Sequence, residues 1–170
     1  MKTKITLTFG VLLVLALAVN ANAQLVAGTA EDRAYTAITS ENNPDAKLAL
    51  LIAFEKNFPQ SRVLADICLM AIDIFKNKKD VLKVAEWGEK AIKADPENVN
   101  ALMETSRNYA MERKSLEKAV SYAQRAVDSV AKKKNEPPPM GYSDDQWKQY
   151  LESLDNSAKM LLTYAKGIRP

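Results

Sequence analysis

Few side chains in this 170-residue sequence have the types and spacing that catalysis or metal binding requires. It has no histidine and a single cysteine, which excludes histidine acid–base catalysis, histidine metal sites, zinc ribbons and an intrachain disulfide. The carboxylate pairs Glu31-Asp32 and Asp144-Asp145 are adjacent, so on a helix their side chains point about 100° apart and do not converge. No glycine-rich phosphate loop, G-x-S-x-G or H-E-x-x-H motif is present. We therefore expect a protein that is not an enzyme and binds neither a cofactor nor a metal ion.

The first 23 residues have the three-part layout of a secretory signal peptide. Lys2 and Lys4 form a basic start, residues 5–19 form an apolar stretch, and Ala-Asn-Ala at 21–23 forms a cleavage site. The apolar stretch is shorter than the roughly 20 residues of a membrane-spanning helix. These features predict cleavage after Ala23, a periplasmic or secreted protein, and no stable membrane insertion after cleavage.

The charge balance argues against two classes of partner. The sequence has 24 Lys and Arg against 21 Asp and Glu, a net charge of +3. Without Lys2 and Lys4 the balance is 22 against 21, so no strong positive field remains to attract nucleic acid or an anionic membrane. We expect Cys68 to be a small buried apolar residue, with intermolecular pairing as the alternative.

Composition and helix punctuation predict an all-α fold. After the signal the sequence is rich in Ala, Leu, Lys and Glu, which favour helix, and lacks runs of alternating β-branched residues. Pro44, Pro59 and Pro96 stand where a first helical turn tolerates proline, and Ser143 with Gln146 forms a capping box. Short links make neighbouring helices antiparallel. We expect helices at residues 29–41, 44–57, 60–76, 80–94, 96–112, 115–133 and 143–166.

One longer connection divides the chain. Three lysines at 132–134 run into three prolines at 137–139, which form a stiff, extended spacer. The lysines favour the C-terminal end of the preceding helix, and a basic binding patch is the alternative. The expected organisation is a signal peptide at 1–23, a helical domain at 24–133, a Lys/Pro-rich linker at 134–142 and a C-terminal helix at 143–170.

Small residues recur along the helical domain. Val84, Gly88 and Ala91 are separated by steps of four and three residues, and the same steps separate Ala119, Ala123 and Ala126. Small side chains at these steps let two helices approach closely, as stacked helical hairpins require.

This spacing resembles the tetratricopeptide repeat, a 34-residue helix–turn–helix unit. Phe75 and Tyr109 fall at or near its first-helix aromatic position, and Pro96 falls at its closing proline. Residues 48–61, LALLIAFEKNFPQS, resemble a Phe-rich variant common in bacterial envelope repeats. The resemblance covers residues 28–133. It implies an exported bacterial member of the family, with a right-handed αα-hairpin superhelix of about three hairpins.

The last predicted helix is amphipathic, with an apolar stripe at steps of three and four. The stripe comprises Trp147, Tyr150, Leu151, Leu154, Ala158, Leu161, Leu162 and Ala165. We expect this helix to cap the end of the stack, because an uncovered end would expose an apolar face. A partner-binding or dimerising helix is the alternative.

In a stack of such hairpins, each unit's first helix lines the concave face, so residues beside its core stripe are binding candidates. We expect the helix at 60–76 to bury Leu64, Ile67, Cys68, Ala71 and Phe75, and the helix at 96–112 to bury Leu102, Ser106 and Tyr109. The candidate partner-binding groove comprises Asp66, Met70, Asp73, Asn100, Met103, Arg107 and Met111. Exposed methionines near an arginine and carboxylates suit a peptide with apolar and charged groups. The alternative is a solvated surface with methionines filling gaps.

These features predict a non-enzymatic protein–protein interaction module, a scaffold or adaptor of the bacterial cell envelope. Its partner would be a peptide or protein bound in the concave groove. The alternative is a structural protein that self-associates, as in a homodimer, through the ends of the solenoid or its terminal helix.

Overall fold

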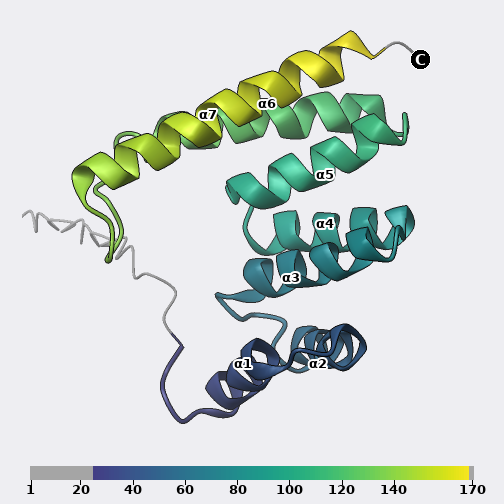
Figure 1. Cartoon of the computed structure of the whole chain (residues 1–170), viewed down its shortest axis with the longest axis vertical. Coiled ribbons are helices and arrows are strands. Elements are labelled where there is room, and N and C mark those ends of the chain that lie inside the picture. Colours follow the sequence, from purple (N-terminus) through teal and green to yellow (C-terminus); the bar gives the residue numbers. More distant parts are fainter. Residues whose placement is uncertain (1–24, 169–170) are drawn as a thin grey trace, which may run out of the picture.

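The computed structural model describes residues 25–168, and all secondary structure in that range is helical (Figure 1). The helices are α1 (Ala30–Ser40), α2 (Pro44–Asn57), α3 (Leu64–Asn77), α4 (Val81–Ala94), α5 (Val99–Met111), α6 (Leu116–Lys133) and α7 (Asp144–Gly167). The predicted all-α class is confirmed, whereas the predicted signal peptide and its cleavage site lie outside the described residues. None of these helices is both long and apolar enough to cross a membrane.

Two helices begin later than the sequence analysis predicts, because their prolines lie in preceding turns. α3 begins at Leu64 and α5 at Val99, so Pro59 and Pro96 are not in the first helical turn. Before α5, the side chain of Asn98 accepts a hydrogen bond from the backbone N–H of Ala101 at 3.0 Å. This asparagine cap starts the helix after the proline.

The other predicted start signals act as expected. Pro44 occupies the first turn of α2 behind the Asn43 cap. At α7, Ser143 Oγ accepts from the N–H of Gln146 at 3.2 Å, and Gln146 Oε1 accepts from the N–H of Ser143 at 3.0 Å. This capping box satisfies two backbone donors that the helix start would otherwise leave unpaired.

The helices form successive layers, with α1 and α2 at one end of the stack and α7 at the other (Figure 1). α3 packs against α4, and α5 packs against α6. α5 also contacts both α3 and α4, and α7 contacts both α5 and α6. α5 therefore packs against the α3–α4 pair, and α7 packs against the α5–α6 pair.

The turns that follow α3 and α5 begin with the same backbone structure, although the second turn is one residue longer and has a further positive φ angle, of 48°, at Ser115. Lys79 and Arg113, which are 34 residues apart, both have positive φ angles, of 57° and 51°. The N–H after each donates to the carbonyl five residues earlier, Asp80 to Phe75 and Lys114 to Tyr109, at 2.9 and 3.0 Å. The first part of the turn after α3 thus recurs 34 residues later, after α5.

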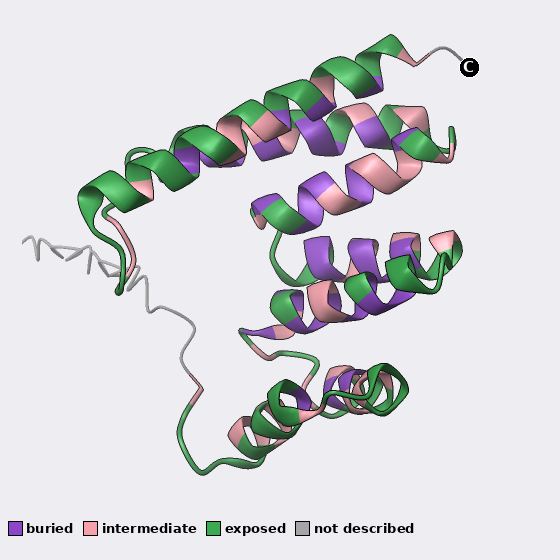
Figure 2. Cartoon of the chain, viewed as in Figure 1, coloured by how far each residue is buried: buried purple, intermediate pink, exposed green. Residues whose placement is uncertain are grey.

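The core runs continuously between the layers (Figure 2). Cys68 is fully buried in it, as predicted. The predicted core residues Ile67, Ala71, Phe75, Leu102 and Ser106 are buried too, whereas Leu64 and Tyr109 are half-buried and pack against the core. Ser106 Oγ donates to the carbonyl of Ala119 at 2.7 Å, which pairs its buried hydroxyl and joins α5 to α6.

Two of the three lysines at 132–134 form ion pairs. Lys132 pairs with Glu97, and Lys134 pairs with Asp155 of α7. Positive charge at this position also complements the C-terminal end of α6. These contacts favour the structural interpretation of the lysines over a basic binding patch.

Candidate partner-binding site

The predicted groove residues lie on α3 and α5, which contact each other in the stack. Asp66 and Asp73 on α3, and Asn100 and Met111 on α5, are exposed. Met70 and Arg107 are half-buried. Six of the seven predicted residues are therefore at least partly accessible.

The prediction for Met103 is wrong. Its side chain is only 7% exposed and belongs to the hydrophobic core. The reason is that α5 is packed on several sides, by α3, α4, α6 and α7, so it buries a wider arc than an amphipathic surface helix does. Thr105 and Ser106, two and three residues after Met103, are buried as well.

Two predicted residues belong to one network of charges, formed by Asp73, Lys76, Glu104 and Arg107 and called the α3–α5 charge network. Lys76 Nζ lies 2.7 Å from Glu104 Oε2 and 3.7 Å from Asp73 Oδ1. The other oxygen of Glu104 accepts from Arg107. Exposed ion pairs contribute about 0–1 kcal/mol each, so the network adds little to the free energy of unfolding.

An apolar hollow of about 240 Å³ lies beside this network, between the α3–α4 turn and the last turns of α5. Val81, Val84 and Met111 supply its apolar lining, and we call it the Met111 hollow. Met111 is 66% exposed. The charged and polar residues around it are Lys76, Lys79, Asp80, Glu104, Arg107, Asn108 and Glu112.

The Met111 hollow has its charged rim held by contacts between helices. Asn108 Nδ2 donates to the carbonyl of Val81 at 3.2 Å, which joins α5 to the start of α4. Lys76 and Glu104 join α3 to α5 on the same rim. The site can accept an apolar side chain and place charged groups of both signs around it.

The remaining predicted residues lie elsewhere. Asp66 and Asn100 are in the first turns of α3 and α5, whereas the Met111 hollow adjoins the last turns. Asp66 is exposed, but partial desolvation of its carboxyl group, and then the nearby carboxylate of Asp95, raise its pKa above the ordinary value. The predicted groove residues therefore do not form one site. Only Asp73, Arg107 and Met111 lie in the Met111 hollow or in the charge network beside it.

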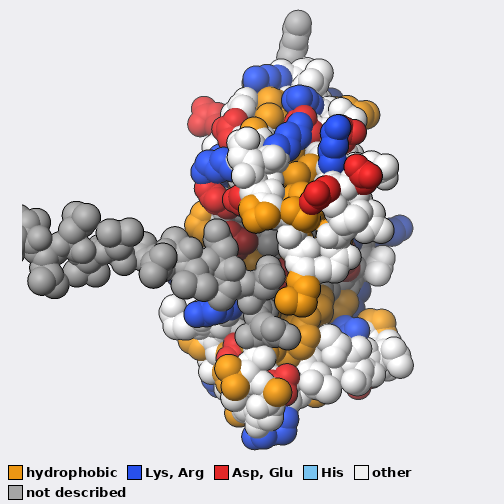
Figure 3. Space-filling model, turned by 90° about the vertical axis from the view of Figure 1, so that its left-hand side faces the viewer, with side chains coloured by type: hydrophobic (Ala, Val, Ile, Leu, Met, Phe, Trp, Pro, Cys, Tyr) orange, Lys and Arg blue, Asp and Glu red, His pale blue; other side chains and the backbone are white. Residues whose placement is uncertain are grey.

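The face of the molecule at the N-terminal ends of α3 and α5 carries charges of both signs. The α4–α5 and α6–α7 connections lie on this side, which Figure 3 views directly. Over the upper layers, Lys and Arg side chains alternate with Asp and Glu around hydrophobic side chains (Figure 3). This visible face thus carries no extended field of a single sign.

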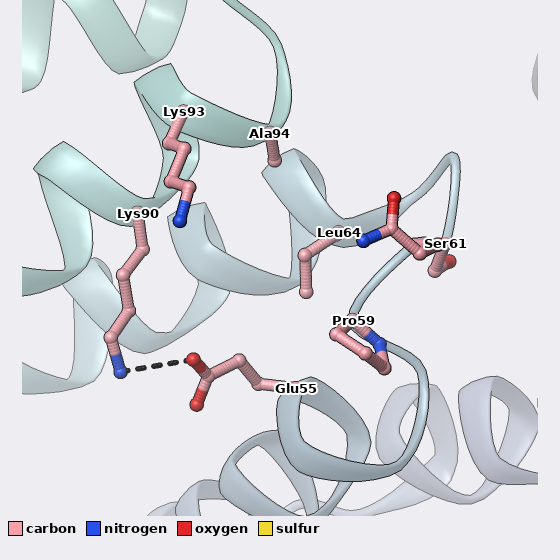
Figure 4. A pocket seen from close by; sticks show the side chains of 8 residues that line it. Glu55, Pro59, Ser61, Leu64, Lys90, Lys93 and Ala94 are labelled. Carbon is pink, nitrogen blue, oxygen red and sulfur yellow. Dashed lines mark ion pairs between the residues drawn. The ribbon is translucent and has the colours of Figure 1, made fainter.

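A second hollow, of about 430 Å³, lies between the α2–α3 connection and the end of α4 (Figure 4). Glu55 and Lys90 form an ion pair across it at 3.2 Å, and Lys93 also lines it. Lys90 lies 3.4 Å from Glu86 as well, and 4.4 Å from the ring centroid of Trp87. Burial lowers the pKa of Lys90, but its bonds to Glu55 and Glu86 outweigh burial and raise that pKa above its ordinary value.

Sequence reasoning missed a hydrogen-bond centre at Glu89 of α4. Its carboxylate accepts from the hydroxyls of Tyr109 and Tyr122 at 2.8 and 2.7 Å, and from Lys118 at 2.9 Å. Burial raises the pKa of Glu89, but these three donors outweigh burial and hold that pKa below its ordinary value. The donors come from α5 and α6, so no local spacing could have revealed the cluster.

Among residues 25–168, no group of three or more Cys, Asp or Glu side chains is placed to hold a metal ion. A scan against protein-family models finds none that matches the chain, and a search of curated proteins finds no match.

Proposed function

We propose that this protein is a non-enzymatic interaction module of the tetratricopeptide type, a scaffold or adaptor of the bacterial envelope. It binds a peptide or protein segment that places an apolar side chain in the Met111 hollow and charged groups against the α3–α5 charge network. The observation that carries this proposal is the Met111 hollow itself, which combines an exposed methionine and two valines with a held, charged rim.

Two recurrences support the repeat type. The 34 residues between Lys79 and Arg113 equal the length of one tetratricopeptide unit. α7 contacts α5 and α6 as α5 contacts α3 and α4, which is the nearest-neighbour stacking of a helical solenoid. A right-handed superhelix of three hairpins and a capping helix is the architecture we infer from them.

The apolar hollow and its charged rim would contribute to binding in different ways. Burying one apolar side chain in the hollow would contribute about 1.5–3 kcal/mol. The charged rim would select among partners and orient them, because rim charges contribute more to specificity and association rate than to affinity. Such a site fits a reversible adaptor.

The location is proposed from the first 23 residues alone. Their basic start, apolar stretch and Ala-Asn-Ala site are those of a Sec signal. N-terminal sequencing of the protein purified from its source would test this, since a mature chain that begins at Gln24 is expected and an intact Met1 would contradict export by cleavage.

Affinity capture from envelope extract tests the binding site. The purified protein and two variants would serve as bait: Met111→Asp, in the hollow, and Met140→Asp, a matched control at another exposed methionine in the linker. We expect a partner held by the wild type and the control but lost with Met111→Asp. Equal capture by all three baits would contradict the proposed site.

A direct titration would then test the charged rim. Once a captured segment is identified, its Kd would be measured against Asp73→Lys/Arg107→Glu, which reverses the two predicted groove charges that belong to the α3–α5 charge network. Weaker binding with unchanged helicity is expected. An unchanged Kd would show that the partner does not contact the α3–α5 charge network.

A further inference from the structure

One side of α7 carries no charge. Six residues, alternately three and four positions apart, fall on one stripe of this helix, which we call the α7 stripe: Tyr150, Ser153, Ser157, Met160, Tyr164 and Gly167. From Gln149 onwards it is flanked by the uncharged residues Gln149, Asn156 and Thr163, and Asp145, in the first turn of α7, lies on the same line as they do. Lys148, Glu152, Asp155, Lys159 and Lys166 lie on the opposite side of the helix.

None of the described helices covers the α7 stripe. α7 packs against α5 and α6 through a different face, where Leu151, Ala158, Leu161 and Ala165 are buried. Its other side is exposed along most of the helix (Figure 2). Met160 and Tyr164 are 73% and 51% exposed, so apolar and aromatic area is available there. Tyr150 is 37% exposed, and its ring packs against Trp147 and Tyr142 of the same chain.

The six side chains form a size pattern that is complementary to the same pattern read in the opposite direction. Along the chain they run large, small, small, large, large, small. In the reversed order, each position that a large residue occupies in the forward order is occupied by a small one. A second α7 that runs antiparallel, about a two-fold axis between residues 158 and 159, therefore places each large side chain opposite a small one. The opposed pairs are Tyr150 with Gly167, Ser153 with Tyr164, and Ser157 with Met160.

We propose that the α7 stripe is the interface of an antiparallel homodimer. Large side chains of one copy would fill the spaces over small residues of the other, as in knobs-into-holes packing. A two-fold interface brings the same surface together with itself, and a stripe without charges avoids both like-charge repulsion and the cost of burying ions. The size pattern matches a second copy specifically, which is why we prefer it to an unrelated partner.

The proposed dimer interface is small in area. Residues 150–167 span about 26 Å of helix, which is too little for the roughly 800 Å² per partner of a standard stable interface. The dimer should therefore be weak and reversible. It lies on α7, away from the Met111 hollow at the α3–α4 turn, so it is independent of the proposed partner site.

Sedimentation velocity of the purified protein over a wide concentration range tests the proposal. We expect a concentration-dependent monomer–dimer equilibrium, weakened about tenfold or more by Ser157→Lys, which buries an ammonium group in the stripe. Glu152→Lys is the matched control, because it makes a larger charge change on the opposite side and should leave the dimer intact. Circular dichroism would show that both variants remain helical.

A mixing experiment tests the antiparallel register. Met160→Glu alone should also weaken the dimer. Mixed with Ser157→Lys, it should form a heterodimer, because the new carboxylate and the new ammonium would lie opposite each other. A monomer at every concentration, a dimer insensitive to Ser157→Lys, or a mixture without heterodimer would each overturn the proposal.

Discussion

Gly88 of α4 lies directly against Thr105 of α5. A Cβ atom on residue 88 would overlap Thr105 Oγ1 and stand 3.0 Å from its Cγ2. Thr105 is fully buried, and its hydroxyl donates to the carbonyl of Ala101 at 2.7 Å, so it cannot easily move aside. The close approach of α4 and α5 therefore depends on the absence of a side chain at residue 88.

Gly88→Ala should destabilise the protein. Alanine gains up to about 1 kcal/mol in helix propensity, but overpacking a core typically costs about 1–3 kcal/mol, and here the clash dominates. Urea unfolding would measure the difference. At protein concentrations at which the protein is a monomer, Gly167→Ala is the control, because a Cβ there meets no atom of the same chain within 4 Å.

The clash can be tested by removing its other partner. In Gly88→Ala/Thr105→Ala, the overlapping Oγ1 and Cγ2 atoms are gone, so the double variant should be more stable than the sum of the two single changes predicts. Strict additivity would mean that Thr105 is not what limits residue 88.

Stability should fall at alkaline pH because of the tyrosines bound to Glu89. Burial and the hydrogen bond to Glu89 raise the pKa of Tyr122 to about 12, and the same causes raise the pKa of Tyr109. An unfolded tyrosine ionises near pH 10. The contribution is therefore complete below about pH 10 and is lost as pH rises from 10 through the folded-state pKa.

Melting temperatures measured between neutral pH and the folded-state pKa of Tyr122, near 12, would check this. Tyr122→Phe should lower stability at neutral pH and flatten the alkaline decline. If the variant and the wild type declined in parallel, the hydrogen bond to Glu89 would not be the source of the pH dependence.

Cys68 should be unreactive while the protein is folded. Burial, and then the negative charge of Glu55, raise the pKa of its thiol to about 12, so almost no thiolate is present at neutral pH. A colorimetric thiol reagent should react slowly with the native protein and rapidly in denaturant. Rapid native labelling would contradict the packing of α3, and a disulfide-linked dimer would support the intermolecular alternative.

Ser143→Ala should loosen the start of α7. Loss of an N-cap side chain costs about 1 kcal/mol, because the N–H of Gln146 loses its acceptor, Ser143 Oγ. The backbone N–H of residue 143 can still donate to Gln146 Oε1. Thermal unfolding would measure the change, with Ser121→Ala at an exposed position of α6 as the control. Equal melting temperatures for the two variants would mean that the capping box adds no stability.

Local signals account for the parts of the fold that could be predicted. Pro44 behind Asn43 and the capping box at Ser143 act within one helical turn, so they place the starts of α2 and α7 correctly. Where two local signals compete, prediction fails: Asn98 starts α5 instead of the earlier Pro96. Phe75 and Cys68 were identified as core residues because a 3.6-residue periodicity is itself local.

The amino-acid sequence by itself therefore determined the helical class, the number and approximate bounds of the helices in residues 25–168, and most of the buried face of α3. Only the tertiary structure decided that Met103 is buried, that Asp73 and Arg107 belong to one network beside the Met111 hollow, and that Glu89 bonds two tyrosines. The physical reason is the separation along the sequence of the residues that each interaction joins. Capping and periodicity act between residues a few positions apart, whereas burial and ion pairing depend on which helices the stack brings together.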